Sequence, residues 1–181
     1  LSFNNTQVRK SEFVHGQFDS HSGLRLLFVG RNQPRKKLER LIALVQRHDD
    51  LYVRFIGPGM ESLEVSSALI DSGKVKVFGK IMGADLISHF DWADIVVNPG
   101  HVGLLAINAA QHGKGIIIDS QSPHAPEFWV AKESRQPFIP FDDDQVVDRF
   151  IDHIRNNRWE LQQWGNRLQE IAKQKYTIEY M

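Results

Sequence analysis

The sequence predicts an α/β protein with a Rossmann-like, doubly wound parallel sheet of about six strands and helices on both faces. Short, continuously apolar segments alternate along the chain with segments whose apolar residues recur at helical spacing. Strands that are apolar on both faces are typical of parallel sheets covered by helices. Several of these apolar segments end at a glycine or at a proline–glycine turn, as strand-to-helix junctions do.

The expected elements follow this alternation. Strands are predicted over residues 24–29, 52–56, 75–78, 94–97, 115–119 and 138–140. Helices are predicted from near Pro34 through Val45, over residues 61–71, 84–90 and 104–112, and throughout residues 144–176. In doubly wound sheets, ligands bind at the carboxyl ends of the strands. The residues that follow each strand are therefore the candidates for a site.

Length and composition narrow the class of protein. The 181 residues suit one domain, and 22 basic residues balance 22 acidic ones. No global field favours nucleic acid, so any anion site is local. The absence of cysteine excludes disulfides and thiolate zinc sites, and is compatible with a reducing cytoplasm. The eight histidines lack metal-ligand spacing, and Asp142-Asp143-Asp144 is interpreted as a helix cap. No metal site is expected.

The junction from Gly30 to Lys36 is the first candidate site. A strand ends at Gly30 and a helix is expected a few residues later, so free backbone N–H groups and the helix dipole favour an anion there. Arg31 offers a planar fork for phosphate oxygens, and Lys36 a movable charge. A solvated basic helix start, with Arg35 and Lys37 beside Lys36, is the alternative.

Three further loops are expected at the same sheet edge. Asn98-Pro99-Gly100-His101-Val102-Gly103 precedes a helix from Leu104, and its glycines allow close backbone approach while His101 offers a donor. Gly57-Pro58-Gly59 is a tight turn that turn chemistry alone could explain. In the third loop, residues 78–81, a nucleotide base could lie against Ile81. Two strand-to-helix junctions on one edge indicate an anion site more strongly than either alone.

Several enzyme classes lack their motifs. The sequence contains no Gly-x-Ser-x-Gly elbow and no Walker phosphate loop. The first junction also lacks Gly-x-Gly-x-x-Gly, which argues against a dinucleotide dehydrogenase.

In this order and spacing, the motifs resemble the C-terminal, donor-binding domain of retaining glycosyltransferases of family four, which have the glycosyltransferase B fold. The matching motifs are Val29-Gly30-Arg31 with Lys36, Gly57 with Gly59, Val77-Phe78-Gly79, and Pro99 through Gly103. The resemblance covers about residues 24–180. It implies that Arg31 and Lys36 grip the donor diphosphate. It also implies that residues 100–104 face the diphosphate and sugar, and that Phe78, Lys80 and Ile81 face the base.

The chain departs from the family pattern at two positions. Many members carry two glutamates eight positions apart, which would fall on Gly100 and Asn108 here. Asn108 could still bind a ribose hydroxyl, but the sugar contact must come from elsewhere. Pro126-Glu127-Phe128 resembles a subset of bacterial surface-polysaccharide enzymes, and Glu127 is a candidate donor-site carboxylate, with a surface or capping role as the alternative.

We therefore expect the donor half of an enzyme that moves a sugar from a UDP- or GDP-sugar to a glycan or lipid-linked acceptor with retained configuration, as in lipopolysaccharide synthesis. Residues 1–20 are expected to be a linker or domain start, and residues 21–181 the nucleotide-sugar-binding domain, inactive alone. The start at Leu1 indicates a trimmed chain lacking an N-terminal acceptor domain. A cytoplasmic location is expected, with peripheral attachment to the inner membrane face left open.

Two other classes remain open. The first is a non-catalytic interaction module that keeps the fold, which the absence of both glutamates motivates. The second is another enzyme of the same fold, such as a nucleotide-sugar epimerase or a phosphorylase. A phosphorylase would need a pyridoxal-binding lysine, which nothing in the sequence identifies.

Overall fold

The computed structural model describes residues 8–180, in which one sheet of six parallel strands has the order β3-β2-β1-β4-β5-β6. The strands are β1 (Leu24–Val29), β2 (Leu51–Ile56), β3 (Val75–Phe78), β4 (Ile95–Asn98), β5 (Ile116–Asp119) and β6 (Phe138–Ile139). The chain builds the sheet outward from β1 in one direction, then returns and builds outward from β4 in the other. This confirms the doubly wound α/β fold expected from the apolar segments.

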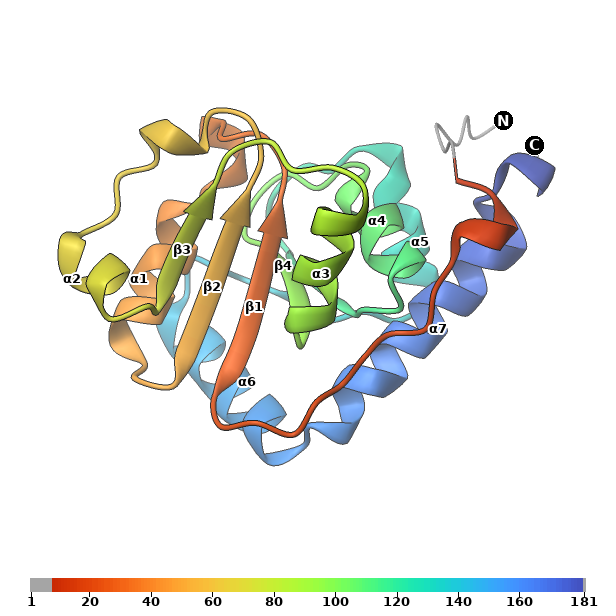
Figure 1. Ribbon diagram of the computed structural model, residues 1–181. Coiled ribbons are helices and arrows are strands. Elements are labelled where there is room, and N and C mark those ends of the chain that lie inside the picture. The colour runs from red at the N-terminus through yellow and green to blue at the C-terminus, as the bar shows by residue number, and fades with distance from the viewer. Residues whose placement is uncertain (1–7, 181) are drawn as a thin grey trace.

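Helices cover both faces of the sheet (Figure 1). They are α1 (Glu39–Arg47), α2 (Ser67–Asp71), α3 (Ala84–Trp92), α4 (Leu105–Gln111), α5 (Trp129–Glu133), α6 (Asp144–Asn156) and α7 (Trp159–Lys175). Right-handed crossovers place α1 and α2 on one face and α3, α4 and α5 on the other. Helix α6 returns to the first face, and α7 packs on α4 and α5.

The core lies between the sheet and these helices. The central strands β1 and β4 supply side chains that are wholly or almost wholly buried, and Phe28 of β1 lies 6.3 Å from Phe55 of β2 between ring centroids. Strands that are buried on both faces pack their apolar side chains against both helix layers. This removes apolar surface from water and stabilises the parallel sheet. The β1–β4 pair, where the winding reverses, therefore supports the candidate loops, which follow the carboxyl ends of these two strands.

Three helix predictions are wrong in their bounds. Instead of one helix from Pro34, a 3₁₀ turn η2 (Pro34–Lys36) ends at Lys37, which has a left-handed backbone with φ 53°, before α1 begins at Glu39. Residues 61–71 divide into the 3₁₀ turn η3 (Met60–Ser62) and the short α2. The C-terminal part is two helices, because Asn157 leaves helical geometry between α6 and α7.

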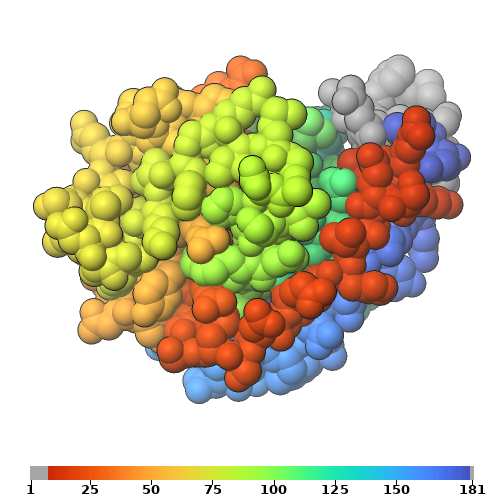
Figure 2. Space-filling model, viewed as in Figure 1, coloured from red at the N-terminus to blue at the C-terminus, as the bar shows by residue number. Residues whose placement is uncertain are grey.

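The segment before β1 lies along α7 and then turns toward the start of β1 (Figures 1 and 2). It includes the 3₁₀ turn η1 (Lys10–Glu12), and Val14 N–H donates to Gln111 O at 2.9 Å. A further 3₁₀ turn, η5 (Ile178–Tyr180), ends the described chain beside it, where Ile178 N–H donates to Val8 O. Residues 1–7 of the expected linker lie outside the described residues.

No helix within residues 8–180 combines the length and apolar character needed to cross a bilayer.

Candidate functional site

A cavity of about 510 Å³ opens at the carboxyl ends of β1 and β4, where the winding of the sheet reverses. This is the place where doubly wound sheets bind ligands. Eight of the predicted site residues line it: Gly30, Arg31, Lys36, His101, Gly103, Leu104, Asn108 and Glu127. The two junctions and Glu127 therefore meet in one cavity, as the sequence predicts.

The turn η2 forms one wall of the cavity, and Lys37, the residue after this turn, anchors it to the end of β5 and the loop that follows. The left-handed backbone of Lys37 directs its Nζ to Ser122 Oγ at 2.9 Å and to Asp119 Oδ2 at 3.5 Å. Burial opposes ionisation of Asp119, but hydrogen bonds from Ser122 and from the Phe141 N–H, with the charge of Lys37, hold its pKa below the usual value. Lys37 is thus an anchor for the turn.

Lys36 joins the two junctions across the cavity. Its Nζ donates to the backbone oxygen of His101 at 2.6 Å, and no carboxylate within residues 8–180 pairs with it. Burial and the charge of Arg35 lower the pKa of Lys36 to about 8. An anion in the cavity would offset both effects, because it supplies the opposite charge that the ammonium lacks.

Arg31 supplies a second cation at the rim. It follows Gly30 at the end of β1, its side chain is exposed, and its guanidinium has no acceptor within the described residues. A free guanidinium fork beside Lys36 suits phosphate oxygens, which accept paired hydrogen bonds.

The second junction is held by tight backbone packing. His101 N–H donates to Arg35 O at 2.8 Å, and the amide of Asn98 donates to His101 O at 3.2 Å. A Cβ atom at Gly100 would lie 2.3 Å from Arg35 O and 2.8 Å from the carbonyl carbon of Lys36. The structure therefore has no room for a glutamate at position 100, where the family resemblance would place one.

Glu127 brings a carboxylate into the cavity from another loop. It lies in the 3₁₀ turn η4 (Pro126–Phe128), the residue is 9% exposed, and its Oε2 is buried without a hydrogen-bond partner. A buried carboxylate oxygen without a donor is costly, so a ligand hydroxyl there would be favoured. Glu127 is thus positioned to accept a hydrogen bond that the protein does not itself provide.

Two histidines brace this loop. His124 accepts from Val102 N–H through Nδ1 at 3.2 Å and donates to Asp119 O through Nε2 at 2.8 Å. Burial lowers the pKa of His124, in agreement with this neutral tautomer. His101 contacts Pro123 O through Nδ1 at 2.8 Å. Both side chains tie the η4 loop to the second junction and thereby position Glu127.

The other predicted site residues lie outside this cavity. Gly57 has φ 145°, and a Cβ there would lie 1.9 Å from Gly30 O. Glycine at this position therefore allows the turns after β1 and β2 to contact each other. Gly59 caps η3, Phe78 lies 4.6 Å from the His89 ring between centroids, and Gly100 and Val102 are buried beneath the cavity. Lys80 is exposed, and Ile81 packs against the core. A base-binding role for Phe78, Lys80 and Ile81 stays a prediction.

The cavity also contains residues that sequence reasoning missed: Val29, Gln33, Arg35, Leu105 and Ala125. Arg35 was visible in the basic run, for which a solvated helix start was the alternative to a phosphate site. Gln33 lies within the first predicted junction but was given no role there. Ala125 carries no local signal, since only the folding of the loop before η4 brings it to the cavity. Within residues 8–180 no cluster of three His, Asp or Glu side chains is arranged to hold a metal ion.

Residues 13–175 match the family model described as "Glycosyl transferases group 1". A comparison with curated proteins gives no match. The family model thus covers both junctions, the η4 loop and the whole of α6 and α7.

The fold is similar to that of several solved glycosyltransferases. Sucrose-phosphate synthase from Thermosynechococcus elongatus aligns with TM-score 0.74 and 18% identity over 96% of this chain and 48% of that one. Anabaena HepE, solved in complex with UDP-glucose, aligns with TM-score 0.64 and 17% identity over 87% and 46%. The catalytic domain of cholesterol-α-glucosyltransferase from Helicobacter pylori aligns with TM-score 0.60 and 22% identity over 83% and 98%. The chain thus spans about half the length of the first two.

Proposed function

Since the chain belongs to the group 1 glycosyltransferases, we propose that it is the donor-binding half of an enzyme that transfers a sugar from a nucleoside-diphosphate sugar. The single observation that carries the proposal is the meeting of Arg31, Lys36 and the unpartnered Glu127 carboxylate in one cavity at the β1–β4 switch point. Two cations suit a diphosphate, and a buried carboxylate suits a sugar hydroxyl.

The proposed chemistry is mainly electrostatic. As the bond between the sugar and the diphosphate breaks, negative charge grows on the leaving phosphate, where Arg31 and Lys36 would stabilise it. At the start of α4, the backbone N–H groups of Leu104 and Leu105 have no acceptor within residues 8–180, and both residues line the same cavity. Together with the two cations, these groups would stabilise the negative charge on the departing diphosphate. The proposed reaction therefore uses no metal.

The proposed donor is a UDP- or GDP-sugar, and the UDP-glucose bound to the similar HepE supports the first. Asn108 is proposed to bind the ribose and Glu127 the sugar. The partial coverage of two solved neighbours supports an N-terminal acceptor domain in the same polypeptide, with a glycan or lipid-linked acceptor. Retention of configuration, a role in bacterial polysaccharide synthesis and a cytoplasmic location are parts of the same proposal.

Calorimetry on the 181-residue chain tests donor binding. We expect UDP or GDP to bind weakly, Arg31→Ala to weaken binding about tenfold because one charge-assisted contact is lost, and Arg149→Ala to have no effect. Arg149 is a matched control because it is exposed on α6, away from the cavity. The site assignment fails if neither nucleotide binds, or if both variants behave alike.

A second titration separates sugar from diphosphate recognition. Glu127→Gln should weaken binding of the sugar nucleotide more than binding of the free nucleoside diphosphate, because only the former carries the hydroxyl that Glu127 accepts. Equal losses for both ligands would assign Glu127 to the structure of the η4 loop.

A non-catalytic interaction module is the second candidate, and the exclusion of a side chain at Gly100 favours it. Assay of the full-length protein with a panel of sugar nucleotides distinguishes the two. Transfer by the full-length protein, with none by this domain alone, supports the enzyme. Full-length protein that binds nucleotide and transfers nothing supports the module.

A further inference from the structure

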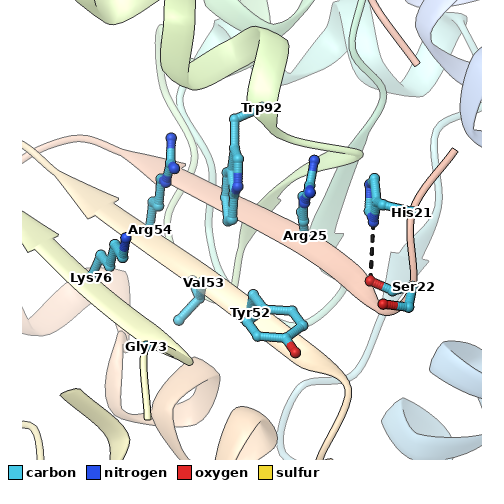
Figure 3. Close-up of a pocket in the computed structure, with 9 residues that line it drawn as sticks. All are labelled: His21, Ser22, Arg25, Tyr52, Val53, Arg54, Gly73, Lys76 and Trp92. Atoms are coloured by element: carbon cyan, nitrogen blue, oxygen red, sulfur yellow. Dashed lines mark hydrogen bonds between the residues drawn. The ribbon is translucent and has the colours of Figure 1, made fainter. Parts of the chain in front are cut away.

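A second pocket lies on the sheet far from the donor cavity, toward the amino ends of β1, β2 and β3 (Figure 3). Its volume is about 260 Å³, and its lining includes Arg25, Tyr52, Arg54, Lys76 and Trp92. None of these residues lines the donor cavity. The pocket is therefore a separate feature of the molecule.

The pattern of the strands explains why this pocket is polar. Arg25 pairs with Tyr52 across β1 and β2, and Arg54 pairs with Lys76 across β2 and β3, so all four side chains leave the same face. Neighbouring residues on the other face, such as Leu26 and Val53, are buried in the core. Helix α3 covers this polar face only in part and ends at Trp92 beside the pocket (Figure 1).

Trp92 lies between two arginines. Its ring centroid is 3.9 Å from the guanidinium carbon of Arg54 and 5.7 Å from that of Arg25. Figure 3 shows the three side chains standing side by side above the sheet, with Lys76 next to Arg54. Stacking on an aromatic ring stabilises each cation and fixes the plane of its guanidinium, while the N–H edges stay available.

Those edges lack anionic partners. Within residues 8–180 the only hydrogen-bond partner of the Arg54 side chain is His89, at 3.1 Å from Nη1 to Nδ1, and its Nε is buried without a partner. Within residues 8–180 the side chains of Arg25 and Lys76 have no hydrogen-bond acceptor and no ion pair. Three cations therefore face one small pocket.

Nearby acids do not neutralise this group. Asp94 is occupied by Arg158 at 3.1 Å, by His21 at 3.0 Å and by the backbone N–H of Arg25 at 2.8 Å. Burial and the charge of Arg54 lower the pKa of His89 by more than the charge of Asp85 raises it. Burial and the charge of Arg25 also lower the pKa of Arg54. Arg25 and Arg54 thus repel each other, and an anion between them would relieve that repulsion.

We propose that this pocket binds the phosphate group of a small ligand, with Arg25, Arg54 and Lys76 contacting its oxygens. Guanidinium edges held at fixed angles suit the several acceptors of a phosphate. The volume holds a phosphate with a small carbon moiety and is too small for a whole nucleotide. The proposal does not depend on the glycosyltransferase activity.

The indole N–H resonance of Trp92, assigned with Trp92→Phe, gives a local readout. Inorganic phosphate titrated at constant ionic strength should shift it saturably, while chloride should not. We expect Arg25→Gln to weaken this binding about tenfold, through loss of a charge-assisted contact, and Lys76→Gln to weaken it several-fold. Arg54 is left intact because its stacking supports the fold. Lys74→Gln is the matched control, since Lys74 faces Asp49 outside the pocket.

Two comparisons complete the test. Arg31→Ala in the donor cavity should leave the Trp92 shift unchanged, which separates this site from the donor site. Cosedimentation with phosphatidylglycerol vesicles distinguishes two sources of the phosphate. If the ligand is a lipid headgroup, the protein sediments with the vesicles and Arg25→Gln does not. If the ligand is a soluble phosphate ester, the protein stays in the supernatant. A Trp92 resonance that stays fixed in phosphate, or that shifts equally in Arg25→Gln and Lys74→Gln, overturns the proposal.

Discussion

At the scale of single residues, the donor cavity depends on side chains that bind and on glycines that let backbones meet. Arg31, Lys36 and Glu127 project polar groups into the cavity, and they were identifiable from the sequence because they follow apolar strands or the strand-end loops. Gly57 and Gly100 were also identified, yet they act beneath the cavity by allowing close backbone contact. Sequence patterns locate such glycines but do not show what approaches them.

Gly100 gives the first prediction. Gly100→Ala should lower the free energy of unfolding by about 1–3 kcal/mol, because its Cβ would press on the backbone of Arg35 and Lys36. It should also weaken nucleotide binding by displacing η2. Urea denaturation and calorimetry measure the two effects. Gly79→Ala is the control for the unfolding measurement, since nothing lies within 4 Å of a Cβ there. Equal behaviour of the two variants would contradict the packing argument.

Lys36 gives a prediction about pH. Its pKa is lowered to about 8, so the ammonium is charged at pH 7 and loses its proton as the pH rises through 8. Nucleotide affinity should therefore fall above pH 8, by at most about tenfold per pH unit for one proton. Lys36→Arg should bind with little pH dependence over this range, because arginine stays charged. Identical pH profiles for the wild type and Lys36→Arg would refute this role.

At the scale of elements, the strands follow directly from the sequence, whereas helix boundaries depend on tertiary contacts. The strand β4 is continuously apolar up to Asn98, so its burial on both faces is readable. The end of η2 at Lys37 is not, because the left-handed backbone there is held by Ser122 and Asp119, 85 and 82 positions away. The short helix α5 was missed, since its five residues are too few for a helical pattern.

Helix α6 was predicted to be capped by the aspartates before it, and Asp143 is the cap. Its carboxylate accepts from Val146 N–H at 3.1 Å. Asp143→Ala should reduce the free energy of unfolding by about 1 kcal/mol, the usual loss for such a cap. Asp142→Ala, at the adjacent exposed position, should have a much smaller effect. Urea denaturation of both variants provides the measurement, and a larger loss in Asp142→Ala would show that the cap is wrongly assigned.

At the scale of the whole molecule, the segment before β1, the loop after α4 and helix α7 meet at three glycines. A Cβ on Gly16 or on Gly165 would lie 2.4 Å or 2.1 Å from Gly113 O. Gln169 of α7 adds hydrogen bonds to Val14 O at 2.6 Å and to Ala110 O at 3.2 Å. The N-terminal segment is thereby fastened to the C-terminal helix across the face that carries α4.

Lys114 secures the same junction from inside, and its replacement tests how strongly the segment is held. The fully buried ammonium donates to Ala93 O at 2.7 Å and to Gln17 O, and lies 4.3 Å from the Phe18 ring. Lys114→Met should lower the free energy of unfolding by about 2–3 kcal/mol and speed amide exchange in residues 13–22.

The buried ammonium of Lys114 also predicts a pH dependence. Burial lowers the pKa of Lys114 to about 8, so between pH 8 and 10.5 the unfolded chain holds the proton more tightly than the folded chain does. The wild type should therefore gain about 1 kcal/mol over the variant on going from pH 8 to 9. Lys132→Met, which removes an ammonium stacked on exposed Trp129, should show neither effect. Unchanged exchange in Lys114→Met would mean that the glycine contacts hold the segment without it.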